Sequence, residues 1–297
     1  MSYGDFPEIA NDYSDKSIQI PRGAIINGNL NEVFDVDTRD PEQVQEFVDH
    51  SWYKYPEADK GLHPWDGITD QHYELPPGSD GTETKFNWLA PDGKYSWIKS
   101  PRWRGHMMEV GPLARMVIGI AKNVPHYKEP ALELLKELNL PLEAAFSTLG
   151  RHAARALECE WITHKLVQYI DDLTANIKAG DETAANMEFW EPKTWPKECR
   201  GVGPCEAPRG ALAHYCVIKN GRLENWQAVV PTTWNASPRS SEGQKGTYEL
   251  SLIGTPLADP KRPLEIIRTI HSFDPCLACA THLYSPEGEE LTSVQVC

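Results

Sequence analysis

The longest run of hydrophobic periodicity in the chain lies between Pro141 and Ala179, where apolar residues recur at helical spacing. This spacing predicts one long helix, with Pro141 in its first turn and Gly180 at its C-terminal end. At about 1.5 Å per residue the helix would be roughly 55–60 Å long, and we expect it to be a core element of a helical bundle. Its apolar positions are Leu142, Phe146, Leu149, Ala153, Leu157, Ile162, Leu166, Ile170, Leu173 and Ile177.

Shorter segments with helical spacing flank this one. They run from Glu109 to Lys122 and from Pro130 to Leu138, and a third, Pro263 to Ser272, leads directly to Asp274. The first hundred or so residues are rich in Pro, Gly, Asp and Trp. That composition predicts mainly loops and short strands packed against something larger, with one short helix from Pro41 to Val48.

Between Ala211 and Val230 the pattern changes to β-rich apolar residues on either side of Asn220-Gly221, the dipeptide that favours a type I′ hairpin turn. Such a hairpin would bring its two flanking segments, Glu206–Gly210 and Pro231–Asn235, to the same end of the strands. The predicted fold class is mainly α with a minor β part (α+β). It has a core bundle of long helices, a β-hairpin and a loop-rich periphery.

Composition limits the classes of function. The chain has 297 residues, 40% of them hydrophobic, which is enough for one large core or two small ones. A formal net charge of −14 argues against a nucleic-acid partner, because phosphate binding needs clustered Lys and Arg. The first residues carry no signal-peptide pattern, and no run approaches the apolar length of a membrane span. We therefore expect export or membrane attachment to come only through a partner.

The run Asp274–His282 carries the strongest chemical signal. Two residues separate Cys276 from Cys279, so both sulfurs can bind one metal, and His282 follows one helical turn later. A thioredoxin-like redox pair also has a CxxC motif, but there the motif normally opens a helix near the start of a small domain. A structural zinc site needs four ligands, and the seven cysteines of the chain supply no second CxxC. The run therefore predicts one arm of a metal site whose other arm lies elsewhere.

Three ordered motifs resemble those of the large subunit of nickel-iron hydrogenases. Asp274–His282 resembles the C-terminal DPCxxCxxH signature of that family, and Glu206–Gly210 and Val230–Asn235 match two internal signatures in the same order. The resemblance covers essentially the whole chain and is closest to membrane-bound uptake hydrogenases. It implies that residues 1–282 form the C-terminal half of a large-subunit domain, because the family's N-terminal RxCGxC-type motif does not occur here. Residues 283–297 would be a C-terminal maturation peptide.

For the site, the resemblance implies a nickel-iron centre whose iron carries cyanide and carbon monoxide. Cys276 would bind nickel terminally and Cys279 would bridge nickel and iron, in keeping with the preference of these metals for soft thiolates. Pro208, Arg209 and Thr232 would form the pocket around the iron ligands, with Arg209 and Thr232 as hydrogen-bond donors.

Arg209 has a second implied role beside the open position between the metals, where hydrogen is split into a hydride and a proton. Because a guanidinium is a poor base, we expect it to act electrostatically, with Cys276 as the first proton acceptor. Asp274 would orient Arg209 in a bidentate pair. A magnesium ion would be held by His282 and by the backbone carbonyl of Ala228.

The resemblance also implies partners and a location. The partners would be an iron-sulfur small subunit, the N-terminal half of the large subunit, a maturation protease and hydrogen itself. Export together with the small subunit would place the complex at the periplasmic face of the cell membrane. Two alternatives stay open: a nickel-holding scaffold or chaperone without catalysis, which would not need the pocket of Arg209 and Thr232, and an inactive truncated fragment.

Overall fold

The computed structural model describes residues 1–9, 11–57, 60–73, 93–185, 187 and 190–276, and the backbone of 280–284 and 290–295. The strands are β1 (Ser2–Pro7), β2 (Ile18–Gly23), β3 (Val44–Phe47), β4 (Ser100–Trp103), β5 (Glu198–Ala207), β6 (Gly210–Lys219), β7 (Arg222–Val229), β8 (Ala280–Tyr284) and β9 (Glu290–Gln295). The helices are α1 (Pro112–Ala121), α2 (Pro125–Glu137), α3 (Thr148–Lys178), α4 (Pro231–Asn235), α5 (Thr247–Leu252) and α6 (Leu264–His271), with 3-10 turns η1 (Pro64–Asp66), η2 (Leu142–Ala145) and η3 (Pro192–Thr194).

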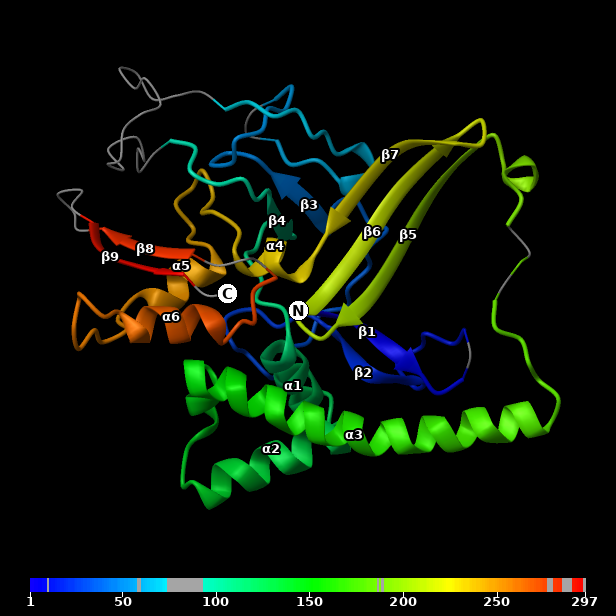
Figure 1. Ribbon diagram of the computed structural model, residues 1–297, viewed down its shortest axis with the longest axis horizontal. Coiled ribbons are helices and arrows are strands. Elements are labelled where there is room, and N and C mark those ends of the chain that lie inside the picture. The colour runs from blue at the N-terminus through cyan, green and yellow to red at the C-terminus, as the bar shows by residue number, and fades with distance from the viewer. Residues whose placement is uncertain are drawn as a thin grey trace.

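These elements form a mixed helix and sheet fold with small antiparallel sheets. The three-stranded sheet β5-β6-β7 lies opposite the long helix α3, and the strand pairs β1-β2, β3-β4 and β8-β9 lie around them (Figure 1). One hydrophobic cluster lies under the sheet and contains Trp103, Tyr215 and Trp234. A second cluster joins α1 to α2 and α3 through residues such as Val117 and Tyr127. The core is therefore divided between the sheet and the helices.

The predicted hairpin is confirmed. Asn220 and Gly221 join β6 to β7 with φ angles of 51° and 70°, as a type I′ turn requires. The sequence pattern does not predict the third strand, β5, whose residues include two glycines and a proline. β5 forms because it pairs with β6 along its whole length, up to Ala207 opposite Gly210.

Two of the shorter predicted helices are confirmed, and a third begins earlier than predicted. α1 lies within the segment predicted from Glu109, and α6 lies within the segment that precedes Asp274. α2 begins at Pro125 and contains Pro130 in its interior. The prediction of a helix from Pro41 to Val48 is wrong. Its residues from Val44 onward form β3, which pairs with β4 and shows the alternating burial of a strand.

The long helix starts later than its hydrophobic pattern predicts. Residues from Leu142 form the 3-10 turn η2, and α3 begins after Ser147, whose Oγ accepts a hydrogen bond from the Gly150 N–H at 3.0 Å. This is an N-cap, which replaces a missing backbone acceptor at the helix start. Gly180, with a φ of 87°, follows the helix as predicted.

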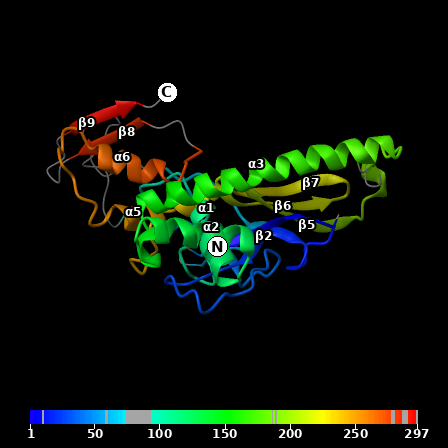
Figure 2. The same cartoon turned by 90° about the horizontal axis from the view of Figure 1, so that it is seen from below.

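The predicted role of α3 as the core of a helical bundle is not found in the described part of the chain. The N-terminal half of the helix packs against α1 and α2, and only Ala154 and Glu158 of its side chains are buried. Its C-terminal half continues past these helices beside the sheet (Figure 2), with its apolar side chains exposed. Within the described residues, no helix has both the length and the apolar character needed to cross a membrane.

Candidate functional site

Two of the three sequence motifs meet at one end of the three-stranded sheet. Pro208 and Arg209 lie at the tip of the turn between β5 and β6, because Ala207 pairs with Gly210 across it. α4 begins at Pro231, just after β7 ends at the same edge (Figure 1). The hairpin therefore places Arg209 and the start of α4 at the same end, as its sequence predicts.

The loop that follows α6 brings the third motif to this edge. The Cys276 N–H donates a hydrogen bond to Thr232 Oγ1 at 3.0 Å, and Thr232 is buried. Arg209 Nε lies 3.3 Å from Asp274 Oδ2, with side chains that are 39% and 41% exposed. Side chains from three separate segments thus come together.

The pair of Arg209 and Asp274 differs from the bidentate geometry expected from the sequence. The structure shows an ion pair in which Arg209 Nε makes no hydrogen bond. Both side chains are partly exposed, so solvent can satisfy the remaining donors and acceptors. The φ of Asp274 is 55°, a left-handed conformation that aspartate tolerates better than most residues and that turns the chain toward Thr232.

Two arginines in the N-terminal half of α3 contact the loop that follows α6. Arg155 Nη2 donates to the Ser272 carbonyl at 2.9 Å, and the Arg151 guanidinium lies 3.9 Å from the ring centre of Phe273. Burial lowers the pKa of Arg155, and the nearby charge of Asp274 opposes this shift. These contacts hold Ser272 and Phe273, which lead into the loop that carries Cys276.

The start of α1 holds the other two motifs. Arg115 donates to the carbonyls of Ala207 and Pro208 at 2.9 and 3.0 Å. Both carbonyls belong to the turn that carries Arg209. The Asn235 side chain, at the end of α4, accepts from the Val110 N–H and donates to the Val110 carbonyl, both at 2.9 Å. Residues 110–115 therefore connect the β5–β6 turn to α4.

Arg115 is itself held by two carboxylates. Its Nε lies 2.6 Å from Glu158 Oε1 and its Nη1 lies 2.9 Å from Glu206 Oε2. Burial alone would lower the pKa of Arg115, but the hydrogen bonds and charges of the two carboxylates outweigh this effect and raise it. Burial raises the pKa of Glu206, while Arg115 opposes that shift. The guanidinium is therefore a permanent charge behind the turn.

The donor set fits one side of a nickel-iron centre. Cys276 is a free, exposed thiol. Its backbone N–H is bonded to Thr232 Oγ1, and Asp274, two residues earlier, pairs with Arg209. No group of three metal-binding side chains occurs among the described residues, so this thiol would need ligands from elsewhere. Cys279 and the side chain of His282 lie outside the described residues. The carbonyl of Ala228 belongs to β7, one residue before that strand ends.

The sequence patterns did not reveal the arginines that support the candidate site. Arg115 did leave a signal, because it is the single charge in the otherwise apolar helix α1, and a buried charge needs partners. Its carboxylate partners are 43 and 91 residues away in the chain. No local pattern marks Arg151 or Arg155, whose roles depend on where α6 lies.

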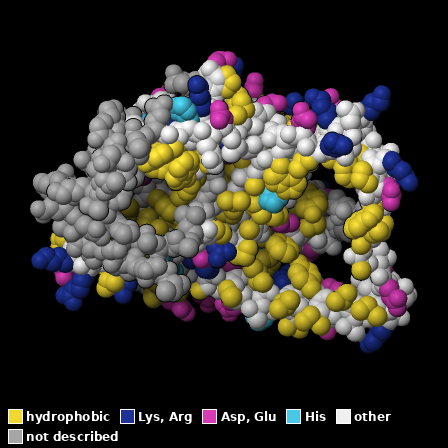
Figure 3. Space-filling model, turned by 45° about the horizontal axis from the view of Figure 1, so that its top comes forward, with side chains coloured by type: hydrophobic (Ala, Val, Ile, Leu, Met, Phe, Trp, Pro, Cys, Tyr) yellow, Lys and Arg dark blue, Asp and Glu magenta, His cyan; other side chains and the backbone are white. Residues whose placement is uncertain are grey.

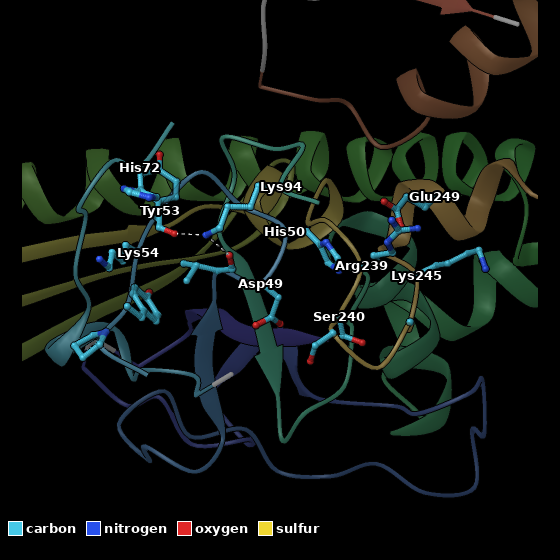
Figure 4. A pocket seen from close by; sticks show the side chains of 15 residues that line it. Asp49, His50, Tyr53, Lys54, His72, Lys94, Arg239, Ser240, Lys245 and Glu249 are labelled. Carbon is cyan, nitrogen blue, oxygen red and sulfur yellow. Dashed lines mark hydrogen bonds between the residues drawn. The ribbon is translucent and has the colours of Figure 1, made fainter. Parts of the chain in front are cut away.

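A separate cavity of about 920 Å³ contains none of the motif residues (Figure 4). Its lining includes His50, Lys94 and Arg239. Lys94 Nζ donates to the carbonyls of Val48 and Ser51 at 3.2 and 2.8 Å, so its charge stabilises the local backbone. The cavity is therefore distinct from the candidate metal site.

Comparison with known proteins identifies the family. The family model for nickel-dependent hydrogenases matches residues 1–282. The chain belongs to the nickel-dependent hydrogenase family. The chain is 61% identical to the uptake hydrogenase large subunit of Rhizobium leguminosarum bv. viciae, over all of this chain and 50% of the relative. It is 54% identical to the hydrogenase-1 large chain of Escherichia coli K12, over all of this chain and 49% of the relative.

Solved structures agree with this family. The Ni-Fe-Se hydrogenase of Desulfomicrobium baculatum, in a reduced, active form, matches with a TM-score of 0.66 and 32% identity over 93% of this chain and 50% of that one. The reduced Ni-Fe-Se hydrogenase of D. vulgaris Hildenborough matches with a TM-score of 0.67 and 32% identity over the same shares. The family predicted from the motifs is confirmed, and the chain spans about half the length of the relatives it matches.

The hydrogen bond between the Cys276 N–H and Thr232 Oγ1 can be tested by substitution of Thr232. Thr232→Val keeps a side chain of similar size but leaves the Cys276 N–H without its acceptor, at a cost of about 1–3 kcal/mol. We expect amide hydrogen exchange at Cys276 to become about tenfold faster or more, because about 1.4 kcal/mol corresponds to a tenfold change. Thr233→Val is the matched control, because the described structure shows no side-chain hydrogen bond for Thr233. Equal exchange rates in the two variants would contradict the contact.

Proposed function

We propose that this chain is the C-terminal part of the catalytic large subunit of an uptake-type nickel-iron hydrogenase, which oxidises hydrogen reversibly to protons and electrons. The observation that carries the proposal is the convergence of Cys276, Thr232 and Arg209 from three segments at one edge of the sheet. The nickel-holding scaffold is less well supported, because a site that only stores nickel would not need Arg209 and Thr232 held against the segment that carries Cys276.

Cys276 and Cys279 would hold the metals together with two thiolates from the N-terminal half. When bound, the nickel-iron centre with its cyanide and carbon monoxide ligands would supply the redox chemistry of hydrogen splitting. Thr232 is suited to a cyanide ligand because a hydroxyl has one donor and two acceptor positions. Its oxygen accepts from the Cys276 N–H, so its hydrogen is still available to donate.

Arg209 would act through its charge and its free donors. Its ion pair with Asp274 involves Nε, which leaves the two Nη groups to point at a ligand. A fixed cation at a polarised centre stabilises developing negative charge without reorganisation. Pro208 would contribute an apolar wall of the same pocket, and Cys276 Sγ would accept the first proton.

We further propose that His282 and the Ala228 carbonyl bind magnesium in the mature subunit. Magnesium prefers oxygen ligands, so the carbonyl is the stronger part of this assignment. The other proposed partners are an iron-sulfur small subunit, which would carry the electrons away, and a maturation protease. The proposed location is the periplasmic face of the cell membrane, reached together with the small subunit.

The N-terminal half of the large subunit would cover the exposed face of α3. Ile162, Leu166, Ile170, Leu173 and Ile177 are 43–59% exposed. Their spacing of three or four residues places them in one stripe along the helix. Hydrophobic side chains gather on this side of the molecule (Figure 3), and a contiguous exposed apolar patch marks an interaction surface. The relatives are about twice as long as this chain, so their remaining half is the occupant that we propose.

Association of the two halves tests that surface. The chain alone should hold no nickel-iron centre. When the chain is mixed with the N-terminal half of an uptake hydrogenase large subunit, the two should form a complex. Ile170→Asp should weaken this complex by about a hundredfold or more, because a charge would be buried without a partner. Ala175→Asp, on the opposite face of the helix, is the control and should bind normally. Stoichiometric nickel and iron, with infrared cyanide and carbonyl bands, in the chain alone would contradict the shared site.

Arg209→Lys tests the catalytic role in a complete enzyme carrying this sequence. Lysine keeps the charge but lacks the planar fork of N–H donors that a guanidinium offers. We expect the centre to assemble with its infrared bands and hydrogen oxidation to fall by about a hundredfold or more. Arg262→Lys, at an 83% exposed side chain, should leave turnover unchanged. Near-normal turnover in Arg209→Lys would show that the assigned role is wrong.

Processing of the tail is a further prediction. β8 pairs with β9, with His282 opposite Ser293, so in the uncut chain the tail holds the backbone of His282 in a strand pair. We expect cleavage after His282 only once nickel is loaded, which would free the new C-terminus to fold inward. Intact-mass measurement of the complete subunit matured with and without nickel tests this. Active enzyme whose chain still ends at Cys297 would rule out both the processing and the magnesium role.

A further inference from the structure

Arg115 uses all of its hydrogen-bonding capacity at one place in the fold. Arginine has five N–H donors in a planar fork, and the structure shows five bonds. Glu158 accepts from Nε and Nη2, and Glu206 accepts from Nη1. The carbonyls of Ala207 and Pro208 accept the other two, from Nη1 and Nη2. The side chain is 1% exposed, so water cannot replace any of these partners.

The two carbonyl contacts act on the residue that follows them. A peptide unit is planar, so fixing the Pro208 carbonyl also fixes the N–H and Cα of Arg209. These carbonyls belong to the turn where the pairing of β5 and β6 ends. Arg115 therefore sets the direction in which the chain enters Arg209.

A second contact fixes the chain on the far side of Arg209. Gly210 has a φ of 128°, and a Cβ placed there would lie 2.5 Å from the Gly111 backbone nitrogen. Gly111 approaches in the same way, because a Cβ on it would lie 3.0 Å from the Arg209 carbonyl. Both contacts come from the residue that precedes α1, one turn before Arg115. The start of α1 thus holds the turn before and after Arg209.

We propose that Arg115 is a positioning residue for hydrogen oxidation, acting through Arg209. This inference rests on the proposed function, because it needs Arg209 to act at the metal centre. Glu158 on α3 and Glu206 on β5 hold the guanidinium, and the guanidinium in turn holds the peptide planes of the turn. A purely structural role would stabilise the fold without acting through Arg209, and the two roles can be separated by experiment.

The test uses the complete, metal-loaded enzyme with its small subunit. Arg115→Lys keeps a charge between the carboxylates but has too few donors, in the wrong geometry, to retain both carbonyls as well. We expect unchanged nickel and iron content, shifted infrared cyanide bands and a turnover reduced by roughly ten- to a hundredfold, the scale of a misplaced catalytic group. Tyr127→Phe is the matched control. It removes only the 2.8 Å bond from Tyr127 Oη to Glu158, so it should lower the melting temperature and leave turnover and infrared bands unchanged.

Combination with Arg209→Lys decides whether Arg115 acts through Arg209. The double variant should turn over no more slowly than Arg209→Lys alone. Additive losses, or normal turnover in Arg115→Lys when Arg209→Lys is impaired, would overturn the inference. Normal turnover in Arg209→Lys would instead reject the proposed function of that residue. If Arg115→Lys failed to load metal, amide exchange at Ala207, Arg209 and Gly210 in the unloaded enzyme would decide. It should be faster in Arg115→Lys than in Tyr127→Phe, and equal protection would overturn the inference.

Discussion

A guanidinium withdrawn from water needs an acceptor for every N–H, and this requirement at Arg115 fixes the relative positions of three elements. Its carboxylate partners lie on α3 and β5, while the arginine lies on α1. Removing one partner of such a buried pair typically costs about 3–5 kcal/mol, because the other charge is left unpaired. The helical cluster and the sheet, which have separate hydrophobic cores, are therefore joined by a charge network with directional hydrogen bonds. Apolar contacts alone are not directional, so they would let the helices shift more easily relative to the sheet.

The candidate site depends on this junction. Its side chains lie on a turn, on the first residues of a short helix and on a loop, none of which has a rigid structure of its own. Each is held by a neighbouring helix: the turn and α4 by the start of α1, and the loop by Arg151 and Arg155 of α3. Electrostatic stabilisation requires such fixed placement, because a group that must reorganise during the reaction loses its advantage. The Cys276 thiol is free and exposed, so further ligands could reach it.

The exposed stripe of α3 and the incomplete ligand set have one explanation in the proposed function. A helix of 31 residues packs against its neighbours over only part of its length, and no group of three metal-binding side chains occurs among the described residues. Both features are expected of a chain whose relatives are about twice as long. The N-terminal half found in these relatives would bury the apolar stripe and supply the remaining thiolates, so folding and metal loading would be coupled.

The sequence alone determined the family, the hairpin, four of the helices, two of them with displaced starts, and the identity of the motif residues, because these depend on local spacing and on residue chemistry. Asn220-Gly221 specifies its turn through backbone conformations that few other residues adopt. The pattern could not predict β5, whose pairing with β6 overrides weak propensity, or β3, whose apolar positions fit a short helix equally well. It also could not predict that the long helix would be exposed, because periodicity shows which face is apolar but not what covers it. Only the tertiary structure decided that Arg115 lies behind Arg209, because its partners come from distant parts of the chain and a hydrogen bond forms only where the fold places donor and acceptor within about 3 Å.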